Sequence, residues 1–167
     1  MCWFRLRKLG LAEIAQFEFS EEVAFEQRLR TLQDRPRLLP RRPAAIADLI
    51  KQPRPVSLSS RTPYEHRVFT VTASVTKMIA EADQDFHLVL RDAAGNTMIA
   101  ESTSPMCAAH ATPLRRRQIA AVHGAVERCM KARVTGVAFF DFKHHQTGVA
   151  PNAIELHPIL NFVCLTN

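Results

Sequence analysis

The sequence lacks any run of about 18 or more apolar residues, so it predicts no membrane span. Its basic start is not followed by a continuous apolar stretch, because Glu13, Gln16 and Glu18 interrupt it, so it predicts no secretory signal either. There are only five glycines, and none is arranged as GxGxxG or GxxxxGK; no GxSxG is present. As written, the chain is therefore expected in the cytoplasm; it would be secreted if the true start or signal differs.

Cysteine is also sparse, and its spacing excludes one kind of site. Cys2, Cys107, Cys129 and Cys164 include no CxxC pair, which argues against a structural zinc site built from thiolates. A bridge between Cys107 and Cys129 is one alternative. Free buried thiols are favoured over it, because no signal peptide directs the chain to an oxidising compartment.

The composition is that of a basic globular protein. Hydrophobic residues make up 47% and charged residues 23% of the 167 residues, and the formal net charge is +6. Residues 1–67 hold 13 Lys and Arg against 8 Asp and Glu, whereas residues 68–167 hold 9 against 8. The positive charge thus lies mainly in the N-terminal part, which weakens a simple argument for nucleic-acid binding by the rest of the chain.

Three segments are expected along the chain. Residues 1–34 form a helical N-terminal extension, with a helix over 11–33. Residues 35–64 form a linker rich in proline and arginine, which a short helix over 44–52 interrupts. Residues 65–167 form the folded domain.

The folded domain is predicted to be mainly β. Residues 67–79 alternate apolar and polar side chains, and further strands are expected over 86–91, 97–101, 133–142 and 153–163. Thr112 and Pro113 mark the start of a helix that continues to Met130. The order β-β-β-α-β-β matches the five-stranded oligonucleotide/oligosaccharide-binding (OB) barrel, in which the loops after the first and fourth strands contact ligands.

The loop between the last two strands, residues 143–152, is the predicted ligand contact. It offers His144, His145, Gln146, Thr147 and Asn152, and it should face an acidic first loop that contains Glu81, Asp83 and Asp85. Three arginines in the first turn of the helix complete the predicted ligand-binding set, since an anion would relieve their unfavourable position at a helix N-terminus: Arg115, Arg116 and Arg117. Pairing of these arginines with Glu81 and Asp83, or exposure to solvent, is the alternative.

The sequence predicts no cofactor, and the alternative is a bound divalent metal ion. Asp83, Asp85 and His144 would be its ligands, and His144 with Asp141 would then be the catalytic candidates. Against this interpretation, acidic loop residues are commonly just solvated, and Asp141 is expected to cap its loop.

Five further residues of the last two strands are expected to be structural. Glu155 and His157 should form a hydrogen-bonded pair on one strand face, and Pro158 should mark a strand edge or a bulge. Phe140 and Phe142 are expected in the core.

Two segments resemble a group of uncharacterised bacterial domains. They are HLVLRDAAGNTMIAE (residues 87–101) and VTGVAFFDFKHHQTGVAPNAIELHPIL (residues 134–160), which match the patterns "HLVL-D…TMI-E" and "TGV-FFD-H-QTG-APN-IELHP". The resemblance covers about residues 66–163. It implies an OB-like fold and an important loop between the last two strands, and it implies no activity. Members of this group often carry a secretion signal.

The sequence therefore predicts a non-enzymatic binding module. Single-stranded nucleic acid or another anionic ligand is the expected partner, by analogy with the fold. The alternatives are a metal-dependent, nuclease-like hydrolase and a protein-interaction domain whose N-terminal helix docks a partner.

Overall fold

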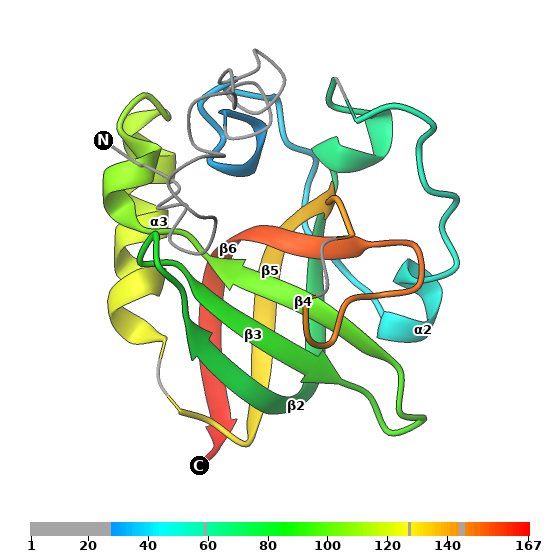
Figure 1. Ribbon diagram of the computed structural model, residues 1–167. Coiled ribbons are helices and arrows are strands. Elements are labelled where there is room, and N and C mark those ends of the chain that lie inside the picture. The colour runs from blue at the N-terminus through cyan, green and yellow to red at the C-terminus, as the bar shows by residue number, and fades with distance from the viewer. Residues whose placement is uncertain (1–27, 59, 127, 144–145) are drawn as a thin grey trace, which may run out of the picture.

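The computed structural model describes residues 28–58, 60–126, 128–143 and 146–167 (Figure 1). The predicted helix over 11–33 lies mostly outside the described residues, as do His144 and His145. None of the described helices is long and apolar enough to cross a membrane.

Five long strands form a closed barrel of the OB-like type, as the sequence predicts. They are β2 (Val68–Ala80), β3 (Phe86–Arg91), β4 (Thr97–Ser102), β5 (Lys131–Phe140) and β6 (Ile154–Thr166). Neighbouring strands follow the order β2-β3-β4-β6-β5, and β5 pairs with β2 to close the barrel. Among these five strands all pairs are antiparallel except β4 with β6, which the chain connects through α3 (Pro113–Ala125) and β5. The predicted strand and helix positions are thus confirmed to within a few residues, except that α3 ends before Met130.

Strand alternation divides the side chains between the barrel interior and its outer surface. Phe69, Val71 and Ala73 of β2 point into the core, whereas Thr70 and Thr72 lie on the outer surface. Gly136 of β5 permits the barrel to close tightly, since a Cβ atom there would lie 2.8 Å from the Cβ of Leu156.

The proline-rich segment packs onto the barrel. Its strand β1 (Arg42–Pro43) pairs in parallel with β2, and its helix α2 (Ile46–Leu49) contributes Ile46 and Leu49 to the main core. The 3₁₀ helix η2 (Pro63–His66) then leads into β2, and its buried Glu65 accepts a hydrogen bond from the backbone N–H of Phe140 at 3.0 Å. Residues predicted to form a linker therefore contact the folded domain along most of their described length.

One expectation about a single side chain is wrong. Phe142 is 40% exposed, because β5 ends at Phe140 and the strand alternation does not extend to position 142. Phe139 is buried instead, on the outer surface of β5 against the ring of His157. Pro158 does mark a bulge, as predicted: the β5–β6 register shifts between Gly136 and Ala138, opposite the cis His157–Pro158 bond.

The three described cysteines are bonded rather than free. Cys129 and Cys164 form a disulfide with a Cα–Cα distance of 5.8 Å, which ties the start of β5 to the end of β6. Cys107, in the 3₁₀ helix η3 (Pro105–Ala108), also has no free thiol. The prediction of free thiols and the alternative pairing of Cys107 with Cys129 are both wrong, because β5 and β6 are neighbours in the barrel and bring Ala132 opposite Cys164.

Candidate functional site: a histidine–carboxylate cluster

A cluster of buried carboxylates and imidazoles lies on the outer surface of the barrel, where β3, β4 and β6 adjoin. Strand alternation explains the position: Leu88, Met98 and Leu156 point into the core, so their neighbours in sequence point outward. The cluster comprises Asp85, His87, Glu101, Asp141, Glu155 and His157, each at most 6% exposed, with Arg30 and Glu81 at its border. In an OB barrel this surface, between the first and fourth loops of the barrel, is the one that contacts ligands.

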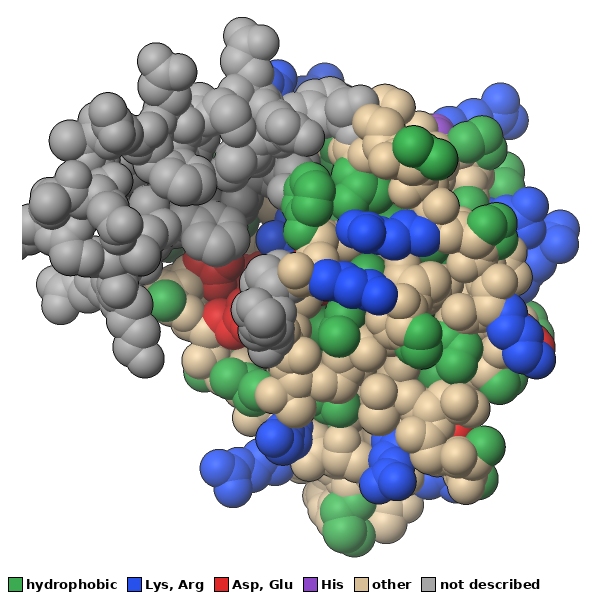
Figure 2. Space-filling view, turned by 45° about the vertical axis from the view of Figure 1, so that its right-hand side comes forward, with side chains coloured by type: hydrophobic (Ala, Val, Ile, Leu, Met, Phe, Trp, Pro, Cys, Tyr) green, Lys and Arg blue, Asp and Glu red, His purple; other side chains and the backbone are tan. Residues whose placement is uncertain are grey.

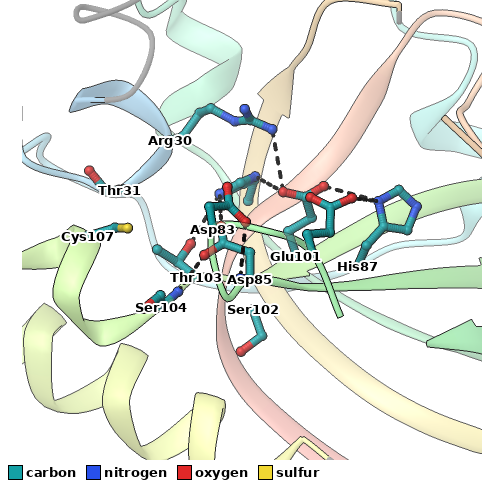
Figure 3. A network of polar contacts seen from close by, with 12 residues as sticks. Arg30, Thr31, Asp83, Asp85, His87, Glu101, Ser102, Thr103, Ser104 and Cys107 are labelled. Atoms are coloured by element: carbon teal, nitrogen blue, oxygen red, sulfur yellow. Dashed lines mark hydrogen bonds and ion pairs between the residues drawn. The ribbon is translucent and has the colours of Figure 1, made fainter. Parts of the chain in front are cut away.

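Glu101 is the centre of the cluster (Figure 3). Its Oε1 lies 3.2 Å from Nδ1 of His87, and its Oε2 lies 3.0 Å from Nδ1 of His157. The guanidinium of Arg30 lies 3.4 Å from the same Oε2. Burial alone would raise the pKa of Glu101, but the nearby His157, His87 and Arg30 outweigh it and hold that pKa well below its usual value.

His87 is held on both sides of its ring. Nε2 donates to the carbonyl oxygen of Thr147 at 3.1 Å, so the last loop of the barrel is anchored to β3. Nδ1 lies 3.2 Å from Glu101 Oε1 and 3.5 Å from Glu81 Oε1. Burial disfavours the charged ring, but the hydrogen bonds to Glu101 and Glu81 together outweigh it and raise the pKa of His87 to about 10.

His157 occupies the deepest position. Its Nδ1 lies 3.0 Å from Glu155 as well as from Glu101, and its Nε2 lies 3.1 Å from the hydroxyl of Thr103. Burial lowers its pKa and the charge of Glu101 raises it, and the net result with the hydrogen bonds is a pKa of about 10. The predicted Glu155–His157 hydrogen bond is confirmed, and it is one link of a larger network.

Two further carboxyls have raised pKa values. Burial, followed by the charges of Asp141 and Glu101, raises the pKa of Glu155 to about 7. Burial also raises the pKa of Asp85 to about 7, although the nearby His157 partly opposes it. Oδ1 of Asp85 accepts a 2.7 Å hydrogen bond from the backbone N–H of Ser104, which fixes the first loop against the end of β4.

Asp141 does not cap its loop as predicted but is buried in the cluster, 1% exposed. Its Oδ2 lies 3.4 Å from both Arg30 and Gln146, while its Oδ1 has no hydrogen-bond partner among the described residues. A buried carboxylate oxygen without a partner is costly, and it adds to the negative character of the cluster. The acidic side chains that reach the surface nearby gather at the left of Figure 2, whereas most Lys and Arg side chains of that view lie elsewhere.

The predicted loop residues serve different purposes. Gln146 contacts Asp141, and Thr147 contributes its backbone carbonyl to His87. Asn152 donates to the carbonyl oxygens of Leu49 and Gln52 at 3.0 and 2.9 Å, so its amide joins the loop to α2. Asp83 accepts from the backbone N–H of Asp85 at 3.2 Å, as expected of an acidic turn residue.

The arginines of α3 do not join the cluster. Arg115 donates to Gln118 of its own helix at 2.6 Å, and Arg116 and Arg117 are exposed. Among the ion pairs of the described residues, none links these arginines to Glu81 or Asp83. Sequence reasoning missed His87, Glu101 and Arg30. The pattern of β3 and β4 could have found the first two, since His87 lies between two apolar residues and Glu101 follows three, in strands that are buried on both faces.

The comparisons with known proteins show no family for this chain. No family model matches this chain, and no curated protein matches it. Among solved structures, it is similar to OBody AM3L09 bound to hen egg-white lysozyme, with 12% identity over 62% of this chain and 86% of that one, at a TM-score of 0.43. It is similar to OBody AM2EP06, also bound to hen egg-white lysozyme, with 11% identity over 60% of this chain and 81% of that one, at a TM-score of 0.41.

Proposed function

We propose that this protein is an OB-like binding module that holds a divalent transition-metal ion between Glu81, His87 and Glu101. One observation carries the proposal. Nδ1 of His87 faces two carboxylate oxygens, at 3.2 and 3.5 Å, while the other ring nitrogen is already committed to a backbone carbonyl.

The carbonyl of Thr147 fixes the tautomer of His87. A carbonyl oxygen can only accept, so Nε2 of His87 must carry the proton. In the neutral ring, Nδ1 is then the atom with the free electron pair, and it points at Glu81 and Glu101. Two carboxylates and an electron pair around one point require a cation there, either a proton or a metal ion. A histidine whose second nitrogen donates to a carbonyl is the usual arrangement of metal-binding histidines.

The distances suit a small tetrahedral ion. Zinc bonds to nitrogen and oxygen of about 2.0–2.1 Å place neighbouring ligand atoms about 3.3–3.4 Å apart. The 3.2 and 3.5 Å separations around His87 lie on either side of this value. Imidazole with carboxylate is a ligand set that zinc and related transition metals accept. The Glu81 side chain is 35% exposed, so an ion or a further ligand can approach from this side.

The remainder of the cluster supports the central ligand. Glu101 is oriented by His157 and Arg30, which hold its second oxygen. The two segments that resemble the bacterial domain group supply both halves: residues 87–101 give His87 and Glu101, and residues 134–160 give Asp141, Thr147, Glu155 and His157. The function of that group would, on this proposal, also depend on the cluster.

Nucleic acid is a poor ligand for this particular surface. Phosphates are attracted to clustered Lys and Arg side chains, whereas the exposed ionisable group here is the carboxyl of Glu81, with those of Asp85, Glu101 and Asp141 buried beneath it. A nucleic-acid site of the kind that the fold suggests would therefore lie elsewhere on the barrel. The alternative ligand set of Asp83, Asp85 and His144 is replaced in this proposal, because Asp85 is held by Ser104 and Asp83 by the turn.

Metal uptake by the full-length protein tests the proposal. The protein is stripped with a chelator and titrated with Zn²⁺ and with Co²⁺ against a chromophoric competitor. We expect one ion per chain, with a Co²⁺ absorption spectrum typical of four-coordinate sites, and tighter binding at higher pH because the proton on Nδ1 must leave. Glu81→Gln should lower the affinity at least tenfold while leaving the buried part of the network intact.

The matched control is Asp92→Asn, which removes one carboxylate charge in the β3–β4 turn. It should bind the ion as the unmodified protein does. The proposal is wrong if the folded, unmodified protein takes up no stoichiometric metal, or if Glu81→Gln and Asp92→Asn have equal effects.

We also propose that the protein works in an oxidising compartment or outside the cell. The Cys129–Cys164 disulfide supports this, since such bonds rarely persist in the cytosol of mesophiles. Thiol titration of protein isolated from its source under denaturing, non-reducing conditions is the test. Two reactive thiols from Cys129 and Cys164 would contradict this proposal and support a cytoplasmic location.

A further inference from the structure

A groove lies between residues 75–78 of β2, residues 128–130 before β5 and Asn167. It has a volume of about 310 Å³, and its apolar lining includes Val75, Met78 and Met130. Met130 is 60% exposed, which is unusual for so large an apolar side chain and places it at the mouth of the groove. Lys77 and Arg128 also line the groove, and both are exposed.

The outer surface of β2 and β5 continues from this groove. Strand pairing places Thr72 beside Arg133 and Ser74 beside Lys131, and on its other edge Ser74 pairs with Arg91 of β3. All five side chains are exposed. Five cations therefore surround the groove and the adjoining row of hydroxyl groups. They are Lys77, Arg91, Arg128, Lys131 and Arg133.

Acidic side chains do not offset these cations in the described part of the surface. The register rows that contain Thr70, Thr72 and Ser74 hold no Asp or Glu. Asp92, next to Arg91, is occupied by its own turn, where it accepts from the backbone of Ala94 and Asn96. Along β5, ten residues or about 30 Å of strand separate Lys131 from Asp141, whereas Lys77 on β2 lies closer to the cluster, opposite Val89.

We propose that this surface binds single-stranded nucleic acid, with phosphates along Lys77, Arg128, Lys131 and Arg133 and one unpaired base in the groove against Met130. The charge suits a polyanion, and an apolar groove between cations suits the flat face of a base. A duplex is a weaker match, because its bases are already paired and stacked. This surface shares no residue with the proposed metal site, so either proposal can fail without the other.

Fluorescence anisotropy with a 5′-labelled dT oligonucleotide of fifteen residues tests the proposal, with the full-length protein at several NaCl concentrations. We expect affinity to fall as salt rises, with a slope of about −3 on a log–log plot if four phosphates are neutralised. The double variant Lys131→Glu/Arg133→Glu should weaken binding at least tenfold and reduce that slope by about 1.4. An oligonucleotide with abasic sites and the Met130→Asp variant should each lose the contribution of the base.

The matched control is Arg37→Glu/Lys51→Glu, which changes the charge by the same amount at two exposed positions of the proline-rich segment. It should bind within about threefold of the unmodified protein, because only non-specific attraction changes. Circular dichroism and the melting temperature establish that each variant is folded.

Several outcomes would overturn the proposal. One is an equal loss in the control and the Lys131/Arg133 variant, which would show non-specific attraction. Another is a larger loss from Arg116→Glu/Arg117→Glu, which would move the contact to α3. Tighter binding of a duplex, or binding of heparin but not of the oligonucleotide, would likewise replace single-stranded nucleic acid by a different polyanion.

Discussion

His87 and Glu101 are directly paired residues of the β3–β4 ladder, and Nδ1 of the imidazole lies 3.2 Å from Oε1 of the carboxylate. Each of the two residues is 1% exposed, so neither side chain is solvated by bulk water. Glu101 uses its second oxygen for His157 and Arg30. One carboxylate therefore compensates three cationic groups that come from three separate segments of the chain.

Removal of this carboxylate should destabilise the barrel strongly. Glu101→Ala leaves His87 and His157 buried beside fewer anions, and breaking a buried ion pair by removal of one partner typically costs about 3–5 kcal/mol. Urea denaturation gives the free energy of unfolding. Asp48→Ala, at an exposed acid of α2, is the control and should change it by less than about 0.5 kcal/mol. Similar values for both variants would contradict the central role of Glu101.

The stability of the metal-free protein should fall as pH rises from about 5 to 10. The pKa of His87 and of His157 is about 10 in the folded protein against an ordinary 6.5, so their contribution is complete below about pH 6.5 and is lost toward pH 10. Asp85 and Glu155 have pKa values of about 7 in the folded protein, against ordinary values of 3.8 and 4.5. They stay protonated to higher pH when folded, so stability also falls as pH rises from about 4 to 7.

The size of this pH effect follows from proton linkage. Each additional proton bound by the folded state gives a slope of about 1.4 kcal/mol per pH unit. Glu101 acts in the opposite direction, since its lowered pKa makes stability fall below about pH 4.5. Denaturant midpoints measured from pH 4 to 10 with a chelator present should therefore have their maximum on the acidic side of neutrality. A stability that increases steadily up to pH 9 would contradict the charged state of the two histidines.

Gly148 should not tolerate a side chain. Its φ of +83° lies in the left-handed region, and a Cβ atom would lie 2.4 Å from Cγ1 of Val89. Gly148→Ala is expected to lower the melting temperature and to displace the loop that supplies the Thr147 carbonyl to His87. Adding Val89→Ala removes the two shortest contacts, those with the Cγ atoms, but not the backbone strain, so it should recover only part of the loss. Complete recovery would show that the backbone conformation is unimportant there.

Loss of the Cys129–Cys164 bond should cost about 3–4 kcal/mol of stability by the loop-closure estimate for a separation of 35 residues. Cys129→Ser/Cys164→Ser is the variant, and its urea midpoint is compared with that of the unmodified protein with and without a reducing agent. The reducing agent should lower the midpoint of the unmodified protein more than that of the variant. Equal sensitivity would mean that another disulfide controls stability.

The barrel could be predicted from sequence because each strand contains its own periodic pattern. The alternation from Phe69 to Ala73 and the turn at Gly95 are local signals, and the structure places both as expected. The residue at which β5 ends could not be predicted from the local sequence. Strand pairing with β6 stops at Phe140, which leaves Phe142 exposed although its spacing fits the strand.

The candidate site was predictable only in part, since it depends on the outer surface of buried strands. The two loops were located correctly by fold, but the cluster is built from His87, Glu101 and Glu155, which lie within strands rather than in loops. Nothing near Arg30 in the sequence indicates that its guanidinium lies 3.4 Å from Glu101 and from Asp141. Such long-range pairing arises from the tertiary fold.

The packing of the proline-rich segment has a consequence for the smallest piece of chain that can fold alone. Ile46 and Leu49 fill part of the barrel core, and the Asn152 amide is satisfied by the carbonyl oxygens of Leu49 and Gln52. A fragment that begins at Glu65 would expose that core and leave the Asn152 amide without these acceptors. The autonomous folding unit therefore includes α2, and proteolytic trimming should stop before this helix rather than at the first long strand.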